Sequence, residues 1–359
     1  MCKGQKYHNG NMNKNLIASH IEEILLAVCA IIVVCFWYFF YPHLLLMREA
    51  SQLFLWNWDY FVERITVPGG FAQYIGEFLV QFFYHPFYGA LIYAILFVIT
   101  QRLTKKMFPQ LNLVLTFFPS IILWVVALQP YIPLTTTVAV VLVMFIIMLL
   151  PKHKKLRIVC AIILLPVVYW LAGPADYYWE EEHQSTLEEM KYDLKVRQKD
   201  WKGIVALYRE QPSHSPAIQH AEQLAEYYLG IISEQKLYNK ELFSNQSLKS
   251  EVSSFIMDEV YFHLGLVNMS QRATFEAMES IPNHNKSGRA LKRLAETSII
   301  TRQYALAQKY LDVLEESIFY RKWAIKMRPL AENPELIQQY PHYQRLQEAY
   351  DKTQDAVFY

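Results

Sequence analysis

Four long stretches without a single charged residue dominate the first half of this 359-residue chain. A charged side chain at the centre of a bilayer costs roughly 2.5–3.5 kcal/mol on insertion scales, so membrane-spanning helices rarely contain one. A transmembrane helix needs about 20 residues. The uncharged stretches over 24–47, 78–101 and 158–175 therefore each predict one membrane span.

The remaining uncharged stretch, over 107–151, is too long for one crossing. The sequence Gln-Pro-Tyr-Ile-Pro at 129–133 interrupts it near its middle, and proline there favours a turn between two helices. Five spans are therefore expected in all. The apolar run of the first span exceeds the ~7–15 residues of a signal peptide, and no small-residue cleavage site follows it, so we interpret it as a permanent anchor.

Charge is distributed very unevenly along the chain. Residues 1–173 carry 12 Lys/Arg and 6 Asp/Glu, whereas 174–359 carry 22 and 27, so a net +6 and a net −5 nearly cancel. This division predicts a transmembrane domain over 1–175 and a water-soluble domain over 176–359. The overall charge of +1 argues against a nucleic-acid partner, and 53% apolar residues argue against a disordered chain.

The basic residues of the first half indicate the orientation in the membrane. Cytoplasmic loops retain Lys and Arg, whereas translocated loops lose them. Basic clusters precede the first span, follow the second span at 102–106 and follow the fourth at 152–157, all on one side of a five-span path. An acidic run at 180–182 follows the fifth span. The amino terminus is therefore expected in the cytoplasm and the second domain outside it.

The first outer loop, over 48–77, predicts an amphipathic helix that lies in the lipid headgroup plane. Its apolar face would hold Phe54, Trp58, Phe61 and Ile65, its polar face would hold Gln52, Asp59 and Glu63, and Pro68-Gly69-Gly70 would end it. Membrane lipid is then one expected partner. In an alternative interpretation, Asp59 together with Glu63 forms a catalytic site at the membrane surface, with Asp59 as a general base or a metal ligand.

The second half shows helical periodicity without strand alternation, so the whole chain is predicted to be all-α. Residues 291–314 form the clearest unit, with two amphipathic helices joined at 301–303 and with small Ala295 and Ala307 twelve positions apart. This unit resembles a tetratricopeptide repeat. The resemblance implies an α-solenoid over most of 185–320 with a period of about 34 residues, further units before it, one of them near Trp201, and a helical cap at 334–350.

Two arginines on the first helix of that unit are candidate binding residues. Arg289 and Arg293 are four positions apart, with Lys286 and Lys292 close by. In tetratricopeptide proteins that bind extended peptides, basic residues at these helix positions hold the terminal carboxylate. The resemblance therefore implies partner binding by these four residues. The alternative is a solvated basic helix face.

The overall layout also resembles an uncharacterised family of multi-span envelope proteins of Bacteroides-type bacteria. The segments that carry this resemblance are Val67-Pro-Gly-Gly-Phe-Ala-Gln-Tyr, Gln81-Phe-Phe-Tyr and Asn285-Lys-Ser-Gly-Arg. The resemblance implies a multi-pass protein of the bacterial inner membrane whose second domain is periplasmic. It implies no activity.

Two functions remain open. The chain contains none of the common nucleotide-binding or zinc-protease motifs and no C-x-x-C, so no cofactor and no metal site are expected. The favoured hypothesis is a non-enzymatic membrane-anchored scaffold whose second domain binds a protein of the cell envelope. The alternative is an enzyme that resembles polytopic glycosyltransferases acting on lipid-linked sugars, with Asp59 as its base.

Overall fold

The structure is a computed structural model that describes residues 20–149, 181–237, 248, 250–281 and 286–353. These residues are helical apart from their turns and a single isolated bridge between Leu55 and Ser317, which confirms the all-α prediction for the described part of the chain. The chain divides into two compact units. The first comprises Met1–Pro42, Phe71–Leu79 and His85–Pro174, and the second comprises His43–Gly70, Val80–Tyr84 and Ala175–Tyr359.

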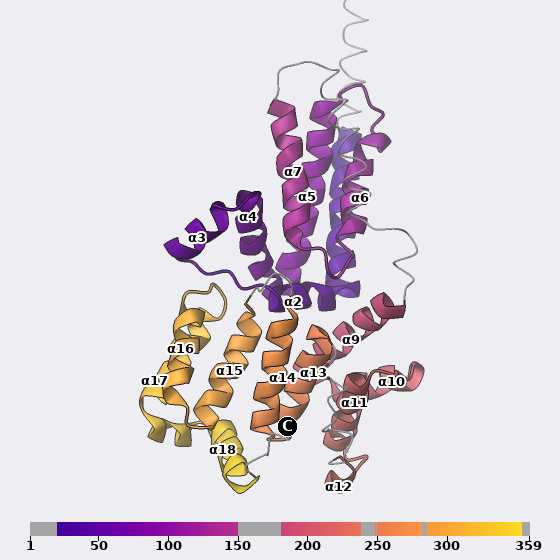
Figure 1. The fold of residues 1–359 in the computed structure, drawn as a ribbon. Coiled ribbons are helices and arrows are strands. Elements are labelled where there is room, and N and C mark those ends of the chain that lie inside the picture. The colour runs from indigo at the N-terminus through magenta and orange to yellow at the C-terminus, as the bar shows by residue number, and fades with distance from the viewer. Residues whose placement is uncertain (1–19, 150–180, 238–247, 249, 282–285, 354–359) are drawn as a thin grey trace, which may run out of the picture. The chain divides into compact units, whose positions relative to one another are not determined.

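The first unit is a bundle of apolar helices around α5 (Figure 1). Helix α5 packs against the end of the first helix, against the segment 114–126 and against α7, and small and apolar side chains form its buried contacts. Its described elements are His20–Phe40, whose last five residues form the π-helical turn η1 (Phe36–Phe40), then most of α4 (Gly70–Val80), α5 (Pro86–Met107), η3 (Val114–Phe117), α6 (Phe118–Val126) and α7 (Leu134–Leu149).

Two of the described helices are long and apolar enough to cross a membrane, namely His20–Phe40 and Pro86–Met107, and by length and composition they indicate a membrane protein. Two shorter apolar helices, Val114–Val126 and Leu134–Leu149, follow them. The turn predicted at 129–133 lies between these two helices, where Pro130 and Pro133 do not interrupt helical hydrogen bonds. The span predicted at 158–175 lies outside the described residues.

The predicted limits of the first two spans were wrong. The first helix ends at Phe40 instead of Met47, because Tyr41 leaves the helical conformation (φ −126°, ψ 33°) before Pro42 starts a new helix, α2 (Pro42–Ala50). The second long apolar helix starts at Pro86 instead of Phe78. Each of these two uncharged stretches thus extends beyond its long apolar helix into neighbouring residues, many of which are buried.

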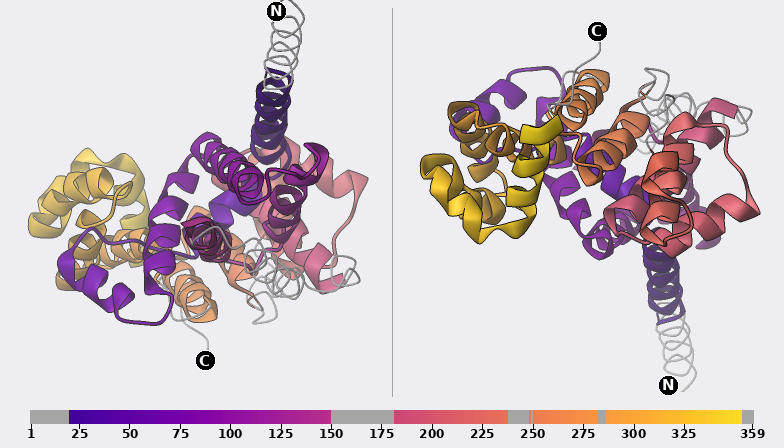
Figure 2. Two further views of the ribbon diagram at one scale, coloured as in Figure 1. Left: turned by 90° about the horizontal axis from the view of Figure 1, so that it is seen from above. Right: turned by 90° about the horizontal axis from the view of Figure 1, so that it is seen from below.

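The second unit is an array of helices in which each of α13 to α17 packs on the next one (Figures 1 and 2). Segments between the two long apolar helices, from the loop predicted at 48–77 and its flanks, complete it, and this region is called the outer loop after its predicted side of the membrane. Its elements are α2 (Pro42–Ala50), α3 (Trp58–Ile65), η2 (Gln81–Tyr84), α9 (Glu181–Arg197), α10 (Trp201–Glu210), α11 (Pro216–Tyr228), α12 (Glu234–Leu237), α13 (Glu251–His263), α14 (Val267–Ser280), α15 (Gly288–Ile300), α16 (Tyr304–Glu315), α17 (Arg321–Glu332), η8 (Pro334–Gln339) and α18 (Pro341–Thr353).

The predicted helix pair is present as α15 and α16, with its turn at 301–303. Its predicted period of 34 residues was wrong. Helix α13 begins at Glu251 and α15 at Gly288, and α14 begins at Val267 and α16 at Tyr304, so both helices of the pair recur after 37 residues. The pair near Trp201 is α10 and α11, and the predicted cap contains η8 and α18.

Enlarging the small residues between α15 and α16 is expected to destabilise the second unit. Ala295 and Ala307 are completely buried in one apolar cluster. We expect Ala295→Phe or Ala307→Phe to lower the free energy of unfolding by about 1–3 kcal/mol, because a close-packed core cannot hold the added ring without strain. Thermal unfolding of the full chain in detergent measures this effect. The exposed Ala305 on α16 supplies the control, and Ala305→Phe should unfold like the wild type.

Candidate functional site

The first outer loop forms part of the second unit through backbone hydrogen bonds. The amide of Leu53 donates to the carbonyl of Lys286 at 2.7 Å, just before α15. The amide of Trp56 donates to the carbonyl of Glu316 at 2.8 Å, just after α16. The loop therefore supplies backbone partners at the ends of the two best-defined repeat helices.

Buried side chains strengthen this attachment. The hydroxyl of Tyr320 donates to Oε1 of Glu49 at 2.8 Å, and the hydroxyl of Ser51 donates to Oε1 of Glu251 at 2.6 Å. Burial raises the pKa of both Glu49 and Glu251 to about 7, although nearby arginines and these hydroxyl donors favour the charged form. The outer loop and the helices at 250–320 thus share one buried polar interface within the second unit.

The amphipathic helix predicted in the loop is shorter than expected. Helix α3 begins at Trp58, where the side chain of Asn57 accepts a hydrogen bond from the amide of Tyr60 at 2.7 Å and caps the helix. Phe54 and Gln52 precede the helix and are both buried, so their predicted places on its two faces were wrong. Trp58 remains 72% exposed on the helix.

Asp59 and Glu63, the alternative catalytic residues, are both exposed on α3. A carboxylate oxygen of Glu63 lies 3.0 Å from Nη1 of Arg64, its sequence neighbour. Neither Asp59 nor Glu63 lines either of the two cavities described below. Among the described residues no group of three His, Cys, Asp or Glu could hold a metal ion. A catalytic role for Asp59 stays a prediction.

Arg289 lies in the interior of the second unit and is only 7% exposed. Its two terminal nitrogens donate to the two carboxylate oxygens of Asp193 on α9, each at 2.8 Å. The guanidinium also lies 4.3 Å above the centre of the Phe255 ring. This bidentate pair joins α15 to α9, two helices that are far apart in the sequence.

Arg293, one helical turn later, is 8% exposed and contacts three carboxylates. Its Nε lies 2.9 Å from Asp258, its Nη2 lies 2.7 Å from Glu259, and its Nη1 lies 3.0 Å from Glu296. Both arginines therefore lie inside the helical array, and the solvated basic face considered from the sequence is wrong for this pair. Whether they hold a partner stays a prediction.

The carboxylates around Arg293 titrate differently. Burial raises the pKa of Asp258 to about 6 despite the nearby arginine. Burial would also raise the pKa of Glu259, yet Arg293 and Arg289 together hold it at about 2. Glu259 therefore stays charged over the physiological range.

Sequence reasoning missed the acidic partners of the two arginines. Asp258 and Glu259 are adjacent on α13, a helix whose other central residues are apolar and buried. Buried carboxylates are almost always paired. Two adjacent acidic residues flanked on both sides by apolar residues were therefore a signal in the sequence for cationic partners, although the sequence did not identify those partners.

The two lysines of the predicted site lie closer to the surface. Lys286 is exposed, and its carbonyl accepts the hydrogen bond from the outer loop. Lys292 is half-buried, with its ammonium 5.3 Å from the centre of the Trp323 ring. The structure thus separates the four predicted binding residues into a buried arginine pair and two more accessible lysines.

A polar cavity of about 90 Å³ lies next to the buried arginines. Lys292 and Arg197 line it together with the two arginines and the three carboxylates of the Arg293 cluster. Tyr84 from the segment before α5 and Tyr320 also contribute to its wall. The cavity is lined entirely by residues of the second unit and is the best-supported candidate binding site in the described part of that unit.

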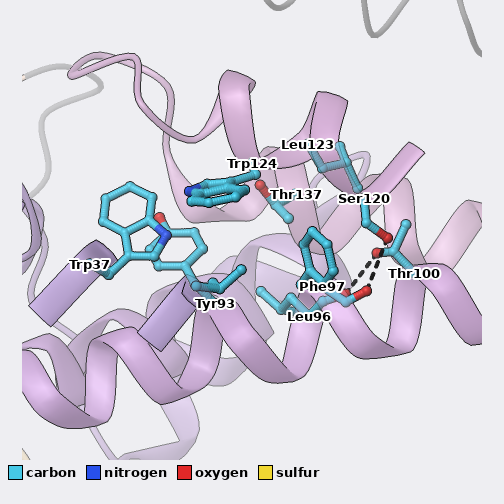
Figure 3. Close-up of a pocket in the computed structure, with 10 residues that line it drawn as sticks. Trp37, Tyr93, Leu96, Phe97, Thr100, Ser120, Leu123, Trp124 and Thr137 are labelled. Carbon is cyan, nitrogen blue, oxygen red and sulfur yellow. Dashed lines mark hydrogen bonds between the residues drawn. The ribbon is translucent and has the colours of Figure 1, made fainter. Parts of the chain in front are cut away.

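A second cavity, in the first unit, is apolar and holds only about 10 Å³, roughly one water molecule (Figure 3). Trp37 and Tyr93 stack there with ring centres 4.3 Å apart. The hydroxyls of Thr100 and Ser120 donate to backbone carbonyls at 2.7 and 3.0 Å, so their polar atoms are satisfied inside the bundle. This cavity is a packing feature of the helices and has no room for a ligand.

Comparisons with known proteins place the chain in a family without assigning it a function. No curated protein and no solved structure matches it. The model of a family of unknown function, DUF6057, matches residues 17–179 and 175–359. Because these two matches together cover nearly the whole chain, the protein belongs to the DUF6057 family.

Proposed function

We propose that the protein is a membrane-anchored scaffold. In this proposal five spans hold a tetratricopeptide-like domain outside the cytoplasm, in the periplasm of a bacterium, where it binds a protein of the cell envelope. The observation that carries the proposal is the incorporation of the first outer loop into the second unit. A helical array that is fixed to the connection between two spanning helices is held at the membrane surface, as a docking platform requires.

The same observation supports five spans. The segments His43–Gly70 and Val80–Tyr84 lie between the two long apolar helices and belong to one unit with Ala175–Tyr359, so they share one side of the membrane with it. An even number of crossings must then separate residue 84 from residue 181. Helix α5 supplies one crossing, so 108–180 must supply an odd number. The proposal assigns three crossings to that segment, one to each of the two shorter apolar helices and one to the uncharged stretch predicted as a span at 158–175.

The partner-binding part of the proposal is supported by the helical array and its polar cavity. Stacked helix pairs expose long surfaces that suit protein partners. The catalytic alternative has less support, because Asp59 is exposed and lines neither described cavity. A general base works better inside a site that excludes water and shifts its pKa.

Single cysteines test the topology. In a cysteine-free background, Glu63→Cys in the outer loop and Glu210→Cys at the end of α10 should both react with a membrane-impermeant thiol reagent in intact spheroplasts, because both positions are exposed and belong to one unit. Lys106→Cys, which is exposed at the end of α5, should react only after lysis. Labelling of Glu63→Cys without Glu210→Cys would contradict the five-span arrangement.

Site-specific photocrosslinking in cells tests the scaffold itself. A photoreactive residue at the exposed Lys286, beside the loop attachment, should give a discrete product with a second protein, whereas one at the exposed Lys322 on α17 should give none. Failure at Lys286 would contradict the proposal. So would loss of an envelope glycan modification in Asp59→Asn at normal protein abundance, since that result would favour the transferase.

A further inference from the structure

The hydrogen-bond acceptors of the polar cavity are already occupied. Asp258 accepts a hydrogen bond from Ser270 at 2.6 Å and pairs with Arg293. Glu296 pairs with the same arginine and accepts from the hydroxyl of Tyr343 at 2.8 Å. Glu259, the third carboxylate of the wall, pairs with both arginines of α15. The carboxylates therefore have their partners within the protein.

The cationic side chains of the cavity, in contrast, carry hydrogen-bond donors that have no acceptor among the described residues. Nε of Arg289 and Nη1 of Arg197 are buried, and among the described residues neither donates to any acceptor. Lys292 forms no ion pair with a carboxylate in the described part of the chain, and its ammonium lies 5.3 Å from the centre of the Trp323 ring. Arg197 of α9 and Arg289 of α15 thus line the cavity, and each carries one buried donor with no acceptor among the described residues, while Lys292 adds a third cationic side chain to the wall.

Leaving such donors unsatisfied is unfavourable. A buried donor without an acceptor costs about 1–3 kcal/mol, and more when its group is charged. Arg289 is more than nine-tenths buried, and its free Nε belongs to a side chain that lines the cavity. Glu49 lies near Arg197, yet burial raises the pKa of this carboxyl to about 7, so its negative charge is incomplete at neutral pH.

We infer that this cavity is a binding site for an oxyanion, a carboxylate or phosphate group of a ligand. Guanidinium groups donate to such anions with favourable geometry, and an ammonium adds a further charge-assisted hydrogen bond. The cavity of about 90 Å³ has room for a group of this size. Half-buried Arg197 and Lys292 provide the accessible side of the site. The inference is independent of the scaffold proposal, because it concerns the chemistry of the ligand and not the protein that carries it.

Binding of inorganic phosphate and of acetate to the full chain in mild detergent tests the inference. At constant ionic strength, with chloride as the reference, at least one of the two anions should bind saturably by calorimetry and raise the melting temperature. Preference for phosphate would identify a phosphate ester as the ligand class, and preference for acetate would identify a carboxylate.

Substitutions locate the binding. Arg197→Gln and Lys292→Gln should each weaken it by about tenfold, since each removes one charge-assisted contact. Both variants should remain folded in chloride, because neither residue forms a carboxylate ion pair within the described residues. The exposed Arg209 and Lys322 give matched controls, and Arg209→Gln and Lys322→Gln should bind like the wild type. Absence of saturable binding to both anions, or equal binding by Arg197→Gln and the wild type, would overturn the inference.

Discussion

Replacing Arg293 with alanine is expected to lower the free energy of unfolding by about 3–5 kcal/mol, one of the largest effects of a single substitution in this protein. The change removes the only cation that contacts Asp258, Glu259 and Glu296 together among the described residues. Three carboxylates would then share a buried space with one fewer positive charge. Denaturant unfolding of the full chain in detergent, followed by circular dichroism, measures the loss.

The matched control is Arg302→Ala. Arg302 also forms a bidentate pair, with Asp351 at 2.7 and 2.6 Å, but its side chain is 46% exposed and that of Asp351 is 48% exposed. Water and salt screen such a pair, so its loss should destabilise the protein far less than the loss of Arg293 does. Similar losses in both variants would show that burial does not decide the strength of these ion pairs.

The burial of Arg289 and Arg293 also determines which residues can be used to test partner binding. The direct test of the predicted binding site would be Arg289→Ala combined with Arg293→Ala, with loss of partner binding as the readout. Because both arginines are buried in ion pairs, that double variant is now expected to destabilise the second unit. Lys286 and Lys292 are the better positions for binding measurements, since they are more exposed.

The wild-type protein is expected to lose roughly 3 kcal/mol of unfolding free energy through Glu49 as the pH rises from 4.5 to 8, and Glu49→Gln is expected to abolish this loss. Burial raises the pKa of Glu49 from 4.5 to about 7, so the folded state retains a proton that the unfolded state has lost between these values. This contribution to stability is complete below pH 4.5 and is lost as the pH rises through about 7. The variant should therefore match the wild type near pH 4.5 and be more stable at pH 8.

Denaturant unfolding of both proteins between pH 4.5 and 8 measures this difference. Glu251, with a pKa of about 7, and His263, with a pKa lowered by burial to about 4, also titrate on unfolding, but they are present in both proteins and cancel in the comparison. Glu63→Gln, on the exposed face of α3, should follow the wild type at every pH. A constant offset between Glu49→Gln and the wild type would contradict the buried, protonated carboxyl.

Local patterns in the sequence determined much of the architecture. The helix pair over 288–315, the turn at 129–133 and the apolar character of the first unit all follow from residues that are close in the chain. Helical periodicity repeats every 3.6 residues and proline acts on its neighbours, so these features can be read in short windows. The period of 37 residues could not be read in such windows, because it depends on where helices far apart in the chain begin.

Only the tertiary structure showed which unit the residues between the two long apolar helices belong to. Only the tertiary structure also showed which carboxylates surround Arg289 and Arg293. Asp193 is 96 positions from Arg289, and Asp258 is 35 positions from Arg293. Leu53 donates its amide to a residue more than two hundred positions away. Contacts between such distant residues produce no periodic pattern in the sequence. The sequence alone therefore does not show which of the chain's 33 acidic residues pairs with a given arginine. Only the packing of helices selects the partner, and with it whether a charge is solvated or buried.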